Sequence, residues 1–196
     1  MYHSRHDQSA SLQHPSDWTE QVLADFGSFL LDHAAAEKKA SGMAISMLSH
    51  YPDRIELVSA MADLAVEELS HYREVVKWIH ARGLKTVADQ KDPYVMEFRK
   101  AVRRGRDEFL LDRLLVAAAI EARGAERFGL VARALEPGPL KKFYQSITRS
   151  EQRHYQLFLD LAGIYLPAAT VAGRWQELLE LEAGIVARLP TRAALH

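Results

Sequence analysis

The amino-acid sequence predicts an all-α protein, a four-helix bundle with one long crossover and an additional C-terminal helix. Long segments repeat apolar residues at helical spacing, and no segment shows the β-branched alternation of a strand. Prolines and glycines fall mainly between the periodic segments, where they end one helix and precede the next. The 196 residues, 48% hydrophobic and 26% charged, are enough for one domain with a sizeable core.

The breaks between the periodic segments set the expected ends of the helices. Residues 51–53, Tyr-Pro-Asp, end the first helix, and Asp53 is a candidate N-cap for the second. Gly83 ends the second helix, and residues 136–139, Glu-Pro-Gly-Pro, are the strongest breaker in the chain. A break is also expected near residues 25–27. The expected helices are therefore residues 18–50, 53–82, 106–135, 140–162 and 171–189.

A polar connection over residues 84–107 separates the second long helix from the third and contains a short helical stretch near 94–104. The other connections are short, so the long helices pair as two antiparallel hairpins. One long crossover between two helical hairpins is the connectivity of ferritin-like bundles. The expected domain covers residues 17–196, and the polar residues 1–16 are expected to form a flexible tail.

A glutamate lies near the middle of the apolar face of each of the four long helices. In the second and fourth helices a histidine follows three residues later, so that each Glu-x-x-His pair points into the bundle from one helix face. The hairpins repeat this pattern, because 31 residues separate the two glutamates of the first hairpin and 30 separate those of the second. The six candidate metal ligands are Glu37, Glu68, His71, Glu121, Glu151 and His154.

Four carboxylates in one core require charge compensation. No lysine or arginine shares their apolar faces, whereas two divalent cations would balance four carboxylates and two imidazoles would complete the ligand set. Carboxylate and imidazole ligands with open positions suit iron or manganese. His33, one turn before Glu37, is expected to support a ligand and not to bind metal itself. Glu20, Glu67 and Glu126 are expected to be ordinary solvated glutamates.

The composition excludes several other kinds of site. Because the sequence has no cysteine, it cannot form a disulfide, a thiolate zinc site, an iron–sulfur cluster or a cysteine nucleophile. The formal net charge of −1 gives no global preference for a nucleic acid or a membrane. The N-terminal residues lack the apolar stretch of a signal peptide, and no apolar run could cross a bilayer. A cytoplasmic protein with no membrane partner is therefore expected.

A basic segment interrupts the near-neutral composition at residues 99–106, in the crossover. Such a run is most often a solvated loop, and the segment alone favours that interpretation, although a local positive field can also bind phosphates. Its five cationic residues are Arg99, Lys100, Arg103, Arg104 and Arg106.

Four stretches of sequence carry more information than the metal ligands alone. They are residues 31–40 (LDHAAAEKKA), 67–71 (EELSH), 120–128 (IEARGAERF) and 150–155 (SEQRHY). In these stretches the sequence resembles the diiron tRNA hydroxylases that act on 2-methylthio-isopentenyladenosine. The resemblance covers about residues 20–165, and Gly124, where a serine is expected, is a small departure that touches no ligand.

This resemblance implies an oxygen-dependent monooxygenase that hydroxylates the isopentenyl group of the modified adenosine in tRNA. It implies that the six ligands bind two iron ions, that dioxygen is a co-substrate, and that an external electron donor, a reductase or electron-transfer protein, supplies two electrons. The cationic residues of the crossover become candidate tRNA contacts. Ferritin-like iron oxidation and storage, or peroxide scavenging, remain alternative functions, whereas a metal-free structural bundle fits the buried carboxylates poorly.

Overall fold

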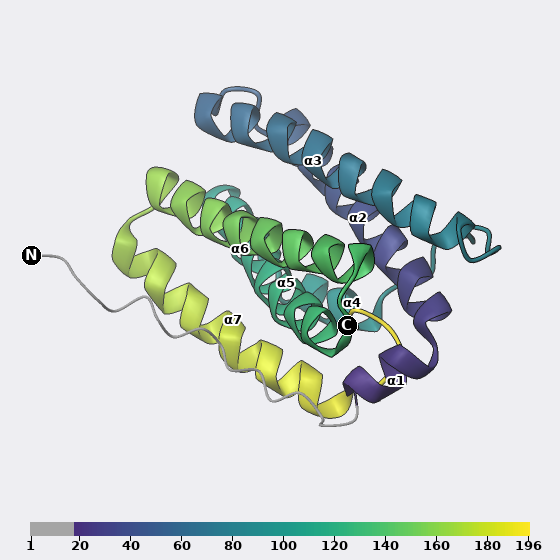
Figure 1. Cartoon of the computed structure of the whole chain (residues 1–196). Coiled ribbons are helices and arrows are strands. Elements are labelled where there is room, and N and C mark those ends of the chain that lie inside the picture. Colours follow the sequence, from purple (N-terminus) through teal and green to yellow (C-terminus); the bar gives the residue numbers. More distant parts are fainter. Residues whose placement is uncertain (1–17) are drawn as a thin grey trace, which may run out of the picture.

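The computed structural model describes residues 18–196, which form seven α-helices and no strand (Figure 1). The helix α2 pairs with α3 and α5 pairs with α6, and the crossover that contains α4 joins these two hairpins. The predicted bundle, long crossover and extra C-terminal helix are confirmed, whereas the predicted tail lies outside the described residues. No helix within residues 18–196 is long and apolar enough to cross a membrane. The helices are α1 (Trp18–Ala24), α2 (Phe26–His50), α3 (Ile55–His80), α4 (Pro93–Ala101), α5 (Arg106–Ala134), α6 (Pro139–Tyr165) and α7 (Ala168–Arg188).

Local side-chain and backbone chemistry explains where α2 and α3 begin. Asp25 caps α2 by accepting a hydrogen bond of 3.1 Å from the backbone N–H of Ser28, so the expected break near 25–27 separates α1 from α2. The prediction that Asp53 caps α3 is wrong. The backbone N–H of Arg54 bonds to the Tyr51 carbonyl, which makes residues 51–54 a turn, and α3 starts one residue later than an Asp53 cap requires.

The remaining helices differ from the expected bounds by a few residues. Pro139 is the first residue of α6 and not part of the preceding break, because a helix tolerates proline where its first N–H groups have no partner. The short helix of the crossover ends at Ala101, since Val102 is extended, so residues 102–104 lie outside it. The helix α6 continues to Tyr165, three residues beyond its expected end.

Two apolar clusters fill the bundle, and the candidate ligands lie between them along each long helix. On α2, Ala34 belongs to one cluster and Ala44 to the other, with Glu37 between them. On α6 the change occurs between Ile147 and Phe158, the stretch that holds the predicted ligands. The core therefore surrounds a central polar layer with apolar side chains on both sides.

The crossover is fastened to α2 at one end and to α5 at the other. Lys38 pairs with Asp89 at 2.9 Å, and Nζ of Lys39 donates to the carbonyl of Gln90 at 2.6 Å. Further along, the guanidinium of Arg103 lies 2.8 Å from the buried carboxylate of Asp112 on α5. The crossover therefore bridges the seam between α2 and α5.

A buried charge network, which the sequence did not reveal, holds α7 against the bundle. Arg123 on α5 is fully buried, and its Nε donates to Oε1 of Glu182 on α7 at 2.9 Å. The hydroxyl of Tyr94 on α4 donates to the same oxygen at 2.9 Å. Arg123 points away from the face of α5 that carries Glu121. The apolar periodicity of that face therefore gave no information about the pairing of Arg123 with Glu182.

Removing one member of this pair should destabilise the protein strongly. Glu182→Ala leaves the Arg123 guanidinium buried without its carboxylate, which should lower the free energy of unfolding by about 3–5 kcal/mol. The measurement is denaturant unfolding followed by circular dichroism. The matched change Glu180→Ala, on an exposed site of the same helix, should cost less than about 0.5 kcal/mol. Similar losses for both variants would contradict a structural role for the pair.

Candidate metal centre

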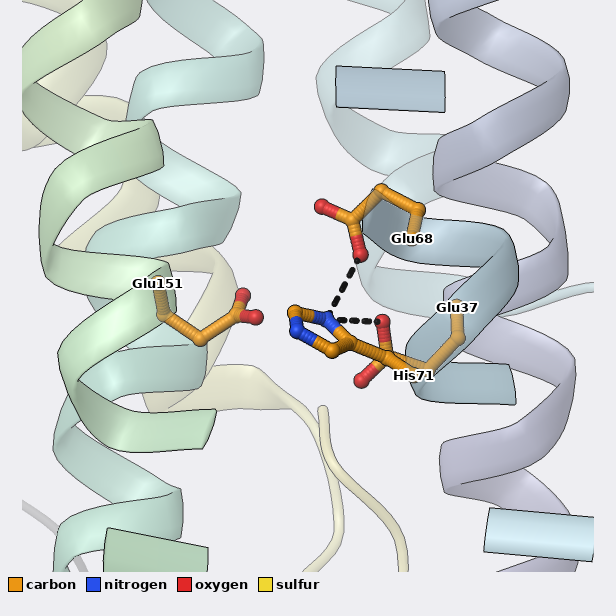
Figure 2. A group of neighbouring side chains, drawn as sticks. All are labelled: Glu37, Glu68, His71 and Glu151. Atoms are coloured by element: carbon orange, nitrogen blue, oxygen red, sulfur yellow. Dashed lines mark hydrogen bonds and ion pairs between the residues drawn. The ribbon is translucent and has the colours of Figure 1, made fainter. Parts of the chain in front are cut away.

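The structure brings the six predicted ligands together in the middle of the bundle, from α2, α3, α5 and α6. Two groups form, and within each group one donor atom per residue lies within 4.8 Å of the others. Figure 2 shows the first group, with Glu151 of α6 facing the three side chains of the other hairpin. The shared members are Glu68 and Glu151. The first group is Glu37, Glu68, His71 and Glu151, and the second is Glu68, Glu121, Glu151 and His154.

The donor atoms of this centre fit a pair of cations. Nδ1 of His154 lies 2.9 Å from Oε1 of Glu68, yet within residues 18–196 neither atom makes a hydrogen bond. Oε1 of Glu151 is likewise buried without a hydrogen-bond partner in this part of the chain. On the other histidine, Nδ1 of His71 lies 3.4 Å from Glu68 and 3.6 Å from Glu37. Buried lone pairs that converge without hydrogen bonds are what a metal ion would satisfy.

Burial and mutual repulsion dominate the acid–base properties of the carboxyl groups. Burial, together with the neighbouring charge of Glu68, raises the pKa of Glu37 well above its usual range. Burial and the neighbouring Glu121 do the same to the pKa of Glu151. Burial would also raise the pKa of Glu68, but the close imidazoles of His154 and His71 outweigh it and hold that pKa well below normal.

The histidines respond in the opposite direction. Burial lowers the pKa of His71, but contacts with Glu37 and Glu68 outweigh it and raise the pKa to about 9. Contacts with Glu121 and Glu68 likewise overcome burial and raise the pKa of His154 to about 11. Protons and cations therefore compete for the same lone pairs, and metal binding would release protons.

His33 contacts the centre through one of its carboxylates. Its Nε2 lies 2.6 Å from Oε1 of Glu37, and its Nδ1 lies 3.2 Å from the hydroxyl of buried Tyr144. Burial lowers the pKa of His33 to about 3, so the ring is neutral. A neutral ring that donates from Nε2 to Glu37 accepts the Tyr144 hydroxyl at Nδ1. This geometry suits the expected supporting role, which stays a prediction.

Glu67 is not the solvated residue that its sequence position suggested. Its Oε1 accepts hydrogen bonds from Ser150 at 2.8 Å and Arg153 at 2.7 Å, and its Oε2 lies 3.3 Å from Nε2 of His154. It therefore contacts the ring nitrogen of His154 that faces away from Glu68. The one available signal was its position four residues before His71, which is shared by many surface glutamates. Glu126 is also partly buried, whereas Glu20 is exposed as expected.

Gly124 leaves room for one of the shared carboxylates. A Cβ atom at this position would lie 3.2 Å from Oε2 of Glu151. The sequence departure at residue 124 therefore does affect the surroundings of a ligand, because any side chain there would press against the Glu151 carboxylate. Glycine leaves the space that the Glu151 carboxylate occupies free of a side chain at position 124.

The cationic residues of the crossover lie outside the metal centre. Arg99, Arg104 and Arg106 are exposed. Lys100 is also exposed and pairs with Glu97, and Arg103 holds Asp112 as described above. Arg103 thus has a structural partner, so the segment offers fewer uncommitted cations than its sequence suggested.

Comparison with known proteins identifies the family. The family model described as tRNA-(MS[2]IO[6]A)-hydroxylase (MiaE) matches residues 4–196. The chain belongs to this family. The resemblance predicted from the four sequence stretches is thereby confirmed.

Relatives of this MiaE-family chain include two proteins named tRNA 2-(methylsulfanyl)-N(6)-isopentenyladenosine(37) hydroxylase. The one from Pseudomonas putida is 37% identical over 158 residues, which cover 81% of this chain and 77% of that protein. The one from Salmonella typhimurium is 35% identical over 155 residues, which cover 79% of this chain and 56% of that protein. This chain therefore matches little more than half the length of the Salmonella protein.

A solved structure supports the fold of this MiaE-family chain. It is named "Protein 43 with aldehyde deformylating oxygenase activity from Synechococcus" and has a TM-score of 0.88 at 32% identity. The similarity covers 95% of this chain and 94% of that one. This similarity, together with the seven helices, confirms the ferritin-like bundle predicted from the sequence.

Ligand substitutions should separate shared from unshared metal contacts. Glu68→Ala removes a donor from both groups, so the iron content should fall close to zero after loading. His154→Ala removes a donor from the second group alone and should leave about one ion per chain. The measurement is elemental analysis of iron-loaded protein, with Glu180→Ala, an exposed glutamate of α7 outside the centre, as the control. Equal iron content in the Glu68→Ala variant and the wild type would contradict this assignment.

Proposed function

We propose that this chain is an oxygen-dependent diiron monooxygenase that hydroxylates the isopentenyl group of 2-methylthio-isopentenyladenosine in tRNA. The observation that carries the proposal is a buried centre of four glutamates and two histidines in a MiaE-family chain. The names of both relatives support this substrate, and the name of the structural neighbour supports oxygen chemistry in this fold.

Two bound iron ions would supply the reductive activation of dioxygen that inserts one oxygen atom into a C–H bond. In the overall reaction the C–H bond becomes C–OH, and the second oxygen atom leaves as water. Two electrons come from an external donor, a reductase or electron-transfer protein, together with two protons. The chain needs no redox cysteine for this role, since the electrons reach it from outside.

The protein's own residues hold and shield the centre. Glu37 and His71 would hold one ion, Glu121 and His154 would hold the other, and Glu68 and Glu151, which belong to both groups, would contribute to both ions. His33 and Tyr144 fix the orientation of Glu37 through their chain of hydrogen bonds. The apolar clusters shield the centre from bulk water along the bundle on either side of it, which limits side reactions.

The activity test supplies iron-loaded protein, a chemical reductant, dioxygen and tRNA that carries the prenylated adenosine. Mass spectrometry of the nucleosides should show one added oxygen atom, and heavy-isotope dioxygen should label it. The Glu68→Ala variant is the negative control, because it should lack the ions. Unchanged nucleoside, together with rapid oxidation of excess ferrous iron into a mineral, would contradict the hydroxylase and favour iron storage.

Binding of tRNA should depend in part on the exposed cations of the crossover. Changing Arg99, Arg104 and Arg106 to glutamine should weaken tRNA binding and lower its salt slope by about one for each lost phosphate contact. Filter binding over a range of salt concentrations measures both quantities.

The control for this test makes the same change of charge elsewhere. Arg73, Arg133 and Arg188 are exposed and lie on α3, α5 and α7, and Arg133 lies at the far end of α5 from Arg106. Their triple change to glutamine should leave the salt slope close to that of the wild type. Equal salt slopes in both triple variants and the wild type would contradict a role of the crossover in tRNA binding and indicate an ordinary solvated segment. Iron content should stay unchanged in both.

A further inference from the structure

A groove between α3 and α6 leads from the surface to the metal centre. Its volume is about 550 Å³, within the range of small-molecule sites. The groove includes His154, so its inner end is continuous with the second group of ligands. Its lining residues are Ile55, Glu56, Ser59, Ala60, Asp63, Leu64, Glu67, His154 and Leu157.

The opposite seam of the bundle is covered. The crossover is bonded to α2 through Asp89 and Gln90 and to α5 through Arg103, so it bridges the α2–α5 side. The groove opens on the other side, between the second helix of each hairpin. In Figure 1, α3 and α6 form one face of the bundle, and no connecting segment of residues 18–196 passes between them. A large substrate can therefore approach the centre from this side.

The lining of the groove suits a nucleoside with a hydrocarbon substituent. Leu64 and Leu157 lie one helical turn from Glu67 and His154 and provide apolar surface for a prenyl group at the inner end, whereas Ile55 lies at the opposite end of the groove beside Glu56. Glu56 and Asp63 provide carboxylate acceptors for the N–H and hydroxyl donors of a base and ribose. The same carboxylates disfavour phosphates, so the phosphodiester backbone would stay outside the groove.

We propose that this groove binds the prenylated adenosine, with the hydrocarbon directed inward to His154 and the base and ribose nearer to the surface. The proposal rests on the proposed function and names where the substrate sits. The adenosine would have to leave its stack to enter, as other buried base-modifying sites require. Glu67 marks the inner end, because its bonds to Ser150 and Arg153 tie α3 to α6 there.

A ferrous ion is the competing occupant, because the groove carries Glu56, Asp63 and Glu67. An ion path, however, needs neither a volume of about 550 Å³ nor an apolar wall. The dimensions and the mixed lining therefore favour the nucleoside. Filling part of the groove with larger side chains distinguishes the two occupants, because it should weaken binding of a nucleoside but only slow the passage of an ion.

The test fills the groove at two positions and leaves the metal ligands intact. Ser59→Phe and Ala60→Phe each place an aromatic ring in the groove, and Ser59 is exposed, so its change should not disturb the core. Ala62→Phe is the matched control, an exposed alanine of α3 outside the groove lining. Iron-loaded protein is kept anaerobic and titrated with two anticodon stem-loop RNAs, one carrying 2-methylthio-isopentenyladenosine and one carrying plain adenosine.

The wild type and Ala62→Phe should bind the prenylated RNA at least about tenfold more tightly than the plain RNA. Both filled variants should lose this preference, with unchanged affinity for plain RNA and unchanged iron content. In turnover assays their kcat/KM should fall by about the same factor. Loss of the preference in Ser59→Phe alone would suffice if Ala60→Phe failed to fold.

Two results would overturn the proposal, and they are distinguishable. Filled variants that keep the preference of an active wild type would refute the groove and leave the hydroxylase standing, and slower iron loading in them would identify an ion path. A wild type that neither prefers the prenylated RNA nor hydroxylates it would refute the proposed function and the groove together.

Discussion

The arrangement of this protein depends on the cost of burying four carboxylates in one core. Glu37, Glu68, Glu121 and Glu151 are each less than one-tenth exposed, and no lysine or arginine among the described residues approaches them within the ion-pair distances found elsewhere in the bundle. Such a cluster is unfavourable unless protons or cations compensate the charge. The pKa values of Glu37, Glu151, His71 and His154 are all raised, which means that the cluster binds protons to reduce its negative charge. Two divalent cations would compensate the same charge and displace these protons.

The rest of the bundle holds the central polar layer, which contains these four glutamates and the two histidines, in place. The two apolar clusters enclose it, and the crossover closes the α2–α5 side. Residues in the stretches that identify the family contribute to the frame as well as to the centre. Lys38 and Lys39 fasten the crossover, Arg123 holds α7 through Glu182, and Arg127 lies 4.8 Å over the Trp18 ring. The side left open is the one where the groove reaches His154.

Much of the fold and the clustering of the six candidate ligands could be predicted from the sequence, because apolar periodicity and the repeated Glu-x-x-His pattern are local signals. Helix ends were less accurate, as Asp53 shows, since capping depends on where a turn closes. Contacts between distant segments left no such signal. The pairing of Arg123 with Glu182, and that of Glu67 with Ser150 and Arg153, join residues 59 and 83 or more positions apart. The ion pair between Arg103 and Asp112 was likewise not predictable from the sequence.

The central claim is that two metal ions share Glu68 and Glu151 inside this layer. Anomalous diffraction at the iron absorption edge, from crystals of iron-loaded protein, tests it most directly. The account predicts two peaks between the hairpins, each in contact with Glu68 and Glu151, one beside His71 and the other beside His154. A single peak, peaks at the protein surface, or an occupied site that lacks both shared glutamates would contradict it.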